Sequence, residues 1–118
     1  HALHDPTEGG VVNGLWELAE ASGLGIEVWA DRIPVATETL EICSELHLDP
    51  LKLMSSGCLL ATVAPNSIGS VMKALRNRGV RVSEVGRVKS RAKGRFLLKE
   101  AKKLDLVAVP QDELYRLS

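Results

Sequence analysis

The chain has 118 residues, of which 45% are hydrophobic, 25% charged and only 3% aromatic. This is typical of one globular domain, and so few aromatic rings argue against a protein that stacks single-stranded nucleic acid. The formal net charge is zero, and the sequence has neither an apolar run of membrane-spanning length nor a signal peptide. Its two cysteines lack metal-type spacing and do not make a disulfide framework. We therefore expect one cytoplasmic domain over residues 1–118 and no membrane partner.

The first ten residues, HALHDPTEGG, directly precede a long amphipathic segment. Pro6 disfavours helical geometry at Asp5, and Thr7 is a suitable N-cap. Gly9 and Gly10 allow backbone to approach a ligand without a Cβ in the way. Because a helix N-terminus offers free N–H groups and a positive dipole end, the segment suits a phosphate. The alternative is a capped helix with a tight entry turn and no ligand.

Apolar residues at helical spacing predict a helix over about residues 8–22, stopped by residues 22–25. Alternation predicts a half-buried strand over 26–31 and a turn at 33–35. A second helix is predicted from Thr37 to about Leu46, with Thr37 as its cap, and Pro50 can start one further helical turn.

Residues 58–64 form a continuous apolar run of strand length, which indicates a central buried strand. A third helix capped by Asn66 or Ser67 follows and closes at residues 77–79. Strands are then predicted over about 80–87, 95–100 and 104–109, with a turn at 90–94 and a last helical turn over 112–117. The predicted class is α+β, a mixed sheet covered by helices.

Charge is unevenly distributed, because residues 1–86 carry a net −5 and residues 87–103 a net +7. Five cations recur at every second position and would share one side of an extended segment: Arg87, Lys89, Arg91, Lys93 and Arg95. They could bind an acidic partner or nucleic acid. The favoured interpretation is a solvated hairpin that discourages edge-to-edge pairing, so a nucleic-acid partner is not expected.

Other residues have a functional and a structural interpretation. Ser55, Ser56 and Gly57 could form a second anion-binding loop or connect a loop to a strand. His4 could act as an acid or base, although a histidine beside Leu3 is more often structural. Cys58 has no evident base to make it a nucleophile, so both it and Cys43 are expected to be small buried hydrophobes.

Several motifs occur in one order along residues 1–110: HDPTEGGV at 4–11, ELAEASG at 17–23, GIEV at 25–28, IPV at 33–35, LDPL at 48–51, SGCLL at 56–60 and GRV at 86–88. Together they resemble the C-terminal domain of aminoimidazole ribonucleotide synthase-related proteins. Hydrogenase maturation factors, selenophosphate synthetase and thiamine-monophosphate kinase belong to the same superfamily. The resemblance implies a domain partly like a ferredoxin fold.

The resemblance also implies that the intact protein is an ATP-dependent synthase or phosphotransferase. This chain would be one domain of that enzyme and is not expected to be active alone. Its N-terminal ATP-binding domain is absent from the chain, and ATP, Mg, a small-molecule substrate and a homodimer are implied for the intact protein. The residues implied to face phosphate or substrate are Asp5, Thr7, Gly9, Gly10, Ser55, Ser56 and Gly57, with Asp5 also a possible metal ligand. No catalytic residue is implied.

Two positions differ from the hydrogenase maturation factors. Glu8 stands where many of them have arginine, and the chain ends in Ser118 where they end in cysteine. From these two differences we do not expect the thiocyanate chemistry of those factors. The alternative function is a non-catalytic small-molecule-binding or regulatory module.

Overall fold

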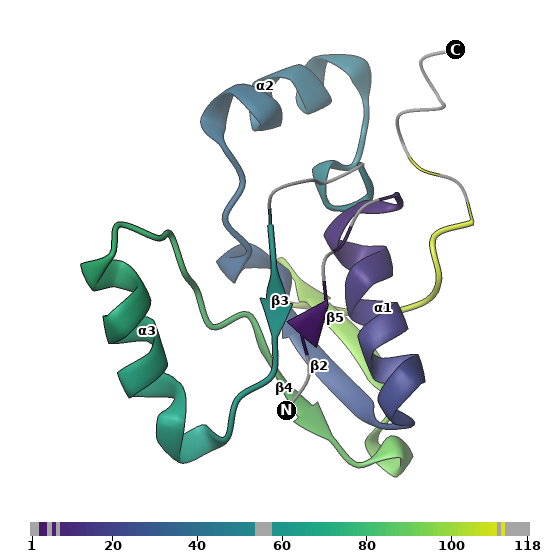
Figure 1. The fold of residues 1–118 in the computed structure, drawn as a ribbon. Coiled ribbons are helices and arrows are strands. Elements are labelled where there is room, and N and C mark those ends of the chain that lie inside the picture. Colours follow the sequence, from purple (N-terminus) through teal and green to yellow (C-terminus); the bar gives the residue numbers. More distant parts are fainter. Residues whose placement is uncertain (1–2, 5, 7, 54–57, 111, 113–118) are drawn as a thin grey trace.

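The computed structural model describes residues 3–4, 6, 8–53, 58–110 and 112. Within these residues it has three α-helices, a four-stranded mixed sheet and a separate two-stranded sheet (Figure 1). The elements are β1 (Leu3–His4), α1 (Gly10–Ser22), β2 (Gly25–Trp29), α2 (Thr37–Leu46), β3 (Leu60–Ala61), α3 (Ile68–Asn77), β4 (Gly86–Lys89), β5 (Arg95–Lys99) and β6 (Lys102–Asp105). The predicted α+β class is confirmed. No helix in the described part is long and apolar enough to cross a membrane.

The core lies between α1 and the four-stranded sheet, whose strand order is β4-β2-β5-β6. Strand β2 runs parallel to β5 and antiparallel to β4, and β6 is antiparallel to β5. Ile26 and Val28 of β2 are buried while Glu27 and Trp29 are half-buried, which is the predicted period-two pattern. The buried contacts across this interface come from Val12, Leu15, Ala19, Ile26, Val28 and Leu97.

Helix α1 ends where the sequence predicts and begins later than predicted. Gly23 takes a left-handed φ of 69°, and the N–H of Leu24 donates to the carbonyl of Ala19 at 3.1 Å. This is a glycine C-cap that only a residue without Cβ adopts at low cost. The helix begins at Gly10 with Gly9 as N-cap, so the prediction of Thr7 as the cap was wrong.

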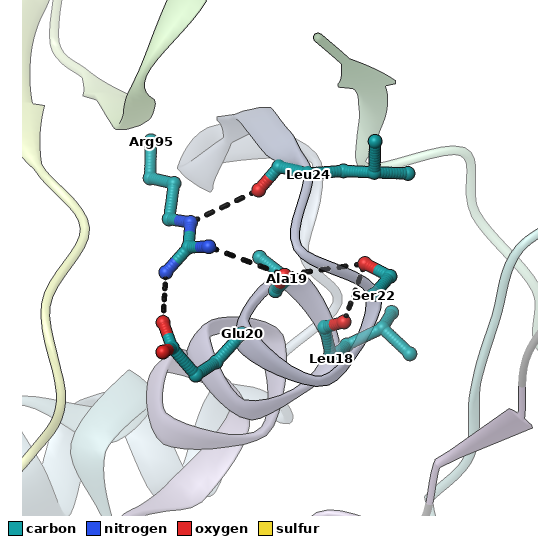
Figure 2. Close-up of polar contacts among 6 residues, drawn as sticks. All are labelled: Leu18, Ala19, Glu20, Ser22, Leu24 and Arg95. Carbon is teal, nitrogen blue, oxygen red and sulfur yellow. Dashed lines mark hydrogen bonds and ion pairs between the residues drawn. The ribbon is translucent and has the colours of Figure 1, made fainter. Parts of the chain in front are cut away.

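Arg95 joins the start of β5 to the end of α1 (Figure 2). Its guanidinium donates to the carboxylate of Glu20, to the carbonyl of Ala19 at 3.3 Å and to the carbonyl of Leu24 at 3.0 Å. The Arg95 guanidinium beside Glu20 holds the pKa of that carboxyl below its ordinary value of 4.5. One side chain therefore fixes α1, the turn after it and β5 relative to one another.

The predicted second and third helices are present, and the predicted cap is wrong for the second helix only. Helix α2 covers the predicted range, yet its N-cap is Ala36, whose carbonyl accepts the N–H of Leu40. The N-cap of α3 is Ser67, one of the two predicted residues, without a side-chain capping bond. Cys43 of α2 is buried as expected, whereas Cys58 is only half-buried.

Two predicted strands are much shorter in the structure, because the strands with which they pair, β1 and β2, end before the predicted ranges do. Of residues 58–64 only Leu60 and Ala61 form a ladder, paired with β1, which Pro6 follows closely. Proline has no N–H to extend a ladder, so the prediction of a central strand was wrong. Of residues 80–87, only the last two pair with β2, because that strand turns into the 3₁₀ segment Ala30–Arg32 just beyond its contact with Val85.

The last hairpin begins earlier than predicted. Glu100 and Ala101 connect β5 to β6 with left-handed φ values of 50° and 65°, the backbone of a tight two-residue turn. Strand β6 therefore covers Lys102–Asp105 rather than residues 104–109. Leu106 is buried and its N–H donates to the carbonyl of Arg95 at 3.0 Å. The segment after it reaches α1, where the N–H of Val109 donates to Asn13.

Gly86 is a packing constraint on the pairing of β4 with β2. A Cβ at this position would collide with the carbonyl oxygen of Glu27, whereas one at Gly69 of α3 would meet no atom within 4 Å. We predict that Gly86→Ala lowers the free energy of unfolding by about 1–3 kcal/mol. Gly69→Ala is the matched control, and we expect it to be neutral or stabilising by up to about 1 kcal/mol because alanine favours helix. Urea unfolding of both variants measures this, and equal stabilities would contradict the assigned pairing.

The ion pair between Glu20 and Arg95 predicts a pH-dependent contribution to stability. Because the pKa of Glu20 is lowered in the folded protein, the stabilisation is present above pH 4.5 and disappears as the pH falls through the folded-state pKa. The melting temperature of the parent should therefore exceed that of Glu20→Gln at pH 7, and the two should converge in acid. Glu41→Gln on α2 controls for charge removal. A difference that does not shrink as the pH is lowered would show that the pair is not its source.

Candidate functional site

The start of α1, where the sequence predicts an anion site, holds an oxyanion that belongs to the chain itself. The backbone N–H of Gly9 donates to a carboxylate oxygen of Asp112 at 2.5 Å. Asp112 is only 1% exposed, and a carboxylate so buried requires donors directed at it. Gly9 adopts a φ of 84°, which turns this N–H outward at the end of the helix. The geometry therefore suits an oxygen anion.

A second hydrogen bond holds the C-terminal segment beside the same end of α1. The N–H of Val109 donates to Oδ1 of Asn13 at 2.9 Å. The amide nitrogen of Asn13 donates in turn to Glu17 at 3.1 Å and to the carbonyl of Glu8 at 3.4 Å. Asn13 thus links the entry to the helix with the segment that delivers Asp112.

Gly10 brings the flanks of the two predicted loops together. A Cβ on Gly10 would lie 2.5 Å from the carbonyl oxygens of Leu51 and Leu53, and its φ is 70°. The 3₁₀ turn Pro50–Lys52, started by the side chain of Asp49 accepting from Leu51 N–H at 3.0 Å, therefore packs against the start of α1. Leu53 lies two residues before the predicted loop at 55–57, and Gly10 is the last residue of the predicted phosphate-facing segment that begins at Asp5.

Most of the predicted site residues lie outside the described residues, namely Asp5, Thr7, Ser55, Ser56 and Gly57. Gly9 and Gly10 are described. Pro6, between the first two, is fully buried and would touch a Cβ at Gly14 of α1. The contact of Gly10 with Leu53 places the described flanks of the two predicted loops at the same end of α1.

His4 lies one turn further along α1, on the face of β1 that contacts the helix. Its Nε2 atom is buried without a hydrogen-bond partner among the described residues and lies 3.8 Å from a carboxylate oxygen of Glu17. A protonated imidazole here would pair with Glu17. The described geometry thus links His4 to the α1 surface and shows no nucleophile or substrate atom beside it.

The described residues fit a phosphate at one position and give no metal site. The N–H of Gly9 suits an oxyanion, whereas the space beside Gly10 is filled by carbonyl oxygens that would repel one. Within residues 3–4, 6, 8–53, 58–110 and 112, no three His, Cys, Asp or Glu side chains gather as metal ligands. Asp5, the one predicted metal ligand, is not among these residues.

A shallow cavity of about 340 Å³ separates the C-terminal segment from the 3₁₀ turn Pro50–Lys52. Apolar side chains, including Val12, Leu51 and Leu97, contribute to its wall. Its charged lining residues are Asp49, Lys52, Lys99 and Asp105. The volume is at the lower end of what small-molecule sites occupy.

The five alternating cations do not share one side, so that prediction was wrong. Residues 91–93 coil into a 3₁₀ turn, which breaks the period of two, and Arg95 turns toward α1. Only Arg87 and Lys89 remain on the edge strand β4, where cations discourage pairing with another chain. Lys89 contacts Glu27 at 2.8 Å, and this hydrogen bond lowers the pKa of that carboxyl.

Sequence reasoning missed Asp112 and Asn13. Asp112 is 103 residues from its partner Gly9, and no local spacing connects the two. Asn13 lies in a helix that was predicted from its apolar residues alone. A polar amide among apolar neighbours near the start of a helix is the signal that could have identified it. Both residues act through contacts made only when the C-terminal segment folds back on α1.

Comparisons with known proteins place this domain in a family. A family model described as the C-terminal domain of AIR synthase related proteins matches residues 1–99. The carbamoyl dehydratase HypE of Bradyrhizobium diazoefficiens is 40% identical over 74 residues, which are 63% of this chain and 21% of that protein. A crystal structure of Escherichia coli HypE, a hydrogenase maturation protein, has a TM-score of 0.84 at 32% identity, covering 99% of this chain and 38% of that one.

Two further structures extend the likeness. A HypE structure in complex with ATP has a TM-score of 0.84 at 29% identity, over 95% of this chain and 36% of that chain. Thiamine monophosphate kinase from Aquifex aeolicus has a TM-score of 0.61 at 25% identity, over 88% of this chain and 32% of that one. The chain thus spans about a fifth of the curated relative and less than two fifths of each solved chain. It belongs to the AIR synthase related proteins and corresponds to their C-terminal domain.

Proposed function

We propose that this chain is the substrate-facing domain of an ATP-dependent synthase or phosphotransferase. A nucleotide-binding part outside the chain, such as the longer relatives have room for, would complete the enzyme. In the intact protein, ATP would activate a small oxygen- or sulfur-bearing group by phosphoryl transfer. We propose a homodimer and Mg for that protein on the same family grounds.

The observation that carries this proposal is that Gly10 and Leu53, which flank the two predicted loops, meet at the start of α1, where the N–H of Gly9 already donates to an oxyanion. Gly10 packs against Leu53, and the N–H of Gly9 donates to the Asp112 carboxylate at 2.5 Å. A HypE relative of the same fold is described in complex with ATP, which supports a nucleotide ligand for the family.

In this proposal the residues of the chain bind and orient rather than react. The hydroxyls of Thr7, Ser55 and Ser56 and the backbone N–H groups of Gly9 and Gly57 would donate to phosphate oxygens or substrate, while Gly10 allows the start of α1 to pack against Leu51 and Leu53. Such preorganised donors stabilise the charge of a transferring phosphoryl group. Asp5 would hold the divalent cation that accompanies the nucleotide, or a polar group of the substrate.

Asp112 competes with a ligand for a donor of the proposed site. Its carboxylate occupies the N–H of Gly9, so a phosphate oxygen that used this donor would first displace it. Because two anions repel, the C-terminal segment would have to move away from α1 before or during ligand binding. The hydrogen bond of Val109 to Asn13 would break or lengthen in the same movement.

The alternative function is a non-catalytic module that binds a small molecule. The cavity of about 340 Å³ beside the C-terminal segment favours it, because its lining combines an apolar wall with two lysines and two aspartates that could orient a small polar molecule. A ligand in this cavity would contact the segment that delivers Asp112.

The test of the proposed function is a calorimetric titration of Mg–ATP into the protein made from the complete gene, beside its Asp5→Asn variant. We expect the parent to bind and Asp5→Asn to bind at least tenfold more weakly, because a metal-facing carboxylate is lost. Unchanged affinity in the variant would remove Asp5 from the site. Absence of binding by both proteins would contradict the ATP-dependent enzyme and favour the binding module.

A second prediction concerns Asp112 alone. Asp112→Asn replaces a charge-assisted hydrogen bond at Gly9 with a neutral one, and the two differ by about 1 kcal/mol. We therefore expect Mg–ATP to bind about fivefold more tightly to Asp112→Asn, with a lowered melting temperature in the absence of nucleotide. Glu100→Gln, in the exposed turn between β5 and β6, is the control for removing one negative charge. Unaltered or weaker binding by Asp112→Asn would mean that the carboxylate does not compete with the nucleotide.

A further inference from the structure

One face of the small sheet formed by β1 and β3 is apolar and exposed. The register pairs Leu3 with Ala61 and His4 with Leu60, so the side chains alternate between two faces. Leu60 faces α1, where it would touch a Cβ at Gly14. On the opposite side, Leu3 is 72% exposed and Leu59, next to the ladder, is 64% exposed. We call Leu3, Leu59 and Ala61 the outer face of this sheet.

The exposure of this face conflicts with the sequence that forms it. Residues 58–64 are the continuous apolar type that sheets bury on both sides, yet the structure covers them on one side only. A ladder of two residue pairs is also too short to persist without further packing. Among the described residues, the outer face therefore lacks the cover that its composition favours.

We propose that the outer face of β1 and β3 is the docking surface for the remainder of the enzyme, and this inference rests on the proposed function. Family members carry this region as a C-terminal domain, and the two solved E. coli chains extend well beyond the 37–38% that it covers. The remainder of such a chain precedes β1 and therefore enters the fold at Leu3, on the outer face itself.

The position of β1 relative to the candidate site supports the same occupant. Strand β1 leads directly into the loop at residues 5–9, and β3 follows the loop at 55–57. A part docked on the outer face would therefore lie beside His4 and Cys58, the described residues next to these two loops. Figure 1 shows β1 and β3 side by side, in front of the four-stranded sheet and next to α1. The uncharged outer face offers nothing to a nucleic acid, whose recognition needs cations.

The test is amide hydrogen exchange on the protein made from the complete gene, in the parent and in the variants Leu59→Ser and Ala61→Glu. We expect the amides of residues 59–63 to be protected in the parent and to exchange at least tenfold faster in both variants. Amides of β2 should be unchanged, which shows that the domain remains folded. The control is Leu104→Ser on β6, because Leu104 is an exposed leucine, at 44%, of the other sheet.

Two results would overturn the proposal. Exchange in Leu59→Ser and Ala61→Glu that matches Leu104→Ser would show that nothing covers the outer face. Protection that depends on protein concentration, together with a dimer that both variants dissociate in light scattering, would assign the face to a second copy. The Mg–ATP titration of the parent protein separates this inference from the proposed function. If the parent does not bind Mg–ATP but its amides at residues 59–63 are protected, only the proposed function is contradicted.

Discussion

The packing of α1 against β2 and β5 is the constraint on which the rest of the structure depends. Val12, Leu15 and Ala19 make the helix side of the core, and Arg95 fixes the end of the helix to β5 through one carboxylate and two carbonyls. With that end fixed, the opposite end is also placed. The 3₁₀ turn at Pro50–Lys52, the C-terminal segment and β1 all meet around the start of α1, and the candidate site is the result.

Local patterns predicted those parts of the fold that local forces determine. The range of α2, the glycine stop of α1 and the half-buried alternation of β2 follow from periodicity and from the backbone freedom of Gly23. The failures share one cause, because pairing needs a partner of adequate length. Residues 58–64 have strand composition, but β1 offers them only two residues before Pro6, and residues 80–85 lie beyond the end of β2.

The sequence predicts a position for the candidate site, but it does not predict the contacts made there. The motif before α1 and its resemblance to a family predict a site at this position, and the contact between Gly10 and Leu53 brings the described flanks of the two predicted loops to one end of α1. The carboxylate that holds the N–H of Gly9 comes from Asp112 near the other end of the chain. Glycines at the start of a helix predict that an anion can bind there. No local pattern predicts that the folded chain itself supplies that anion.

These features describe one domain whose two unusual surfaces adjoin each other. The start of α1 holds an internal carboxylate, and the outer face of β1 and β3 exposes leucines where a strand is normally covered. The most direct measurement follows the backbone N–H resonance of Gly9 by NMR during addition of Mg–ATP to the protein made from the complete gene. The account predicts a saturable shift of this resonance, accompanied by that of Val109 as the C-terminal segment leaves Asn13. A Gly9 resonance that stays fixed while other amides report nucleotide binding would contradict it.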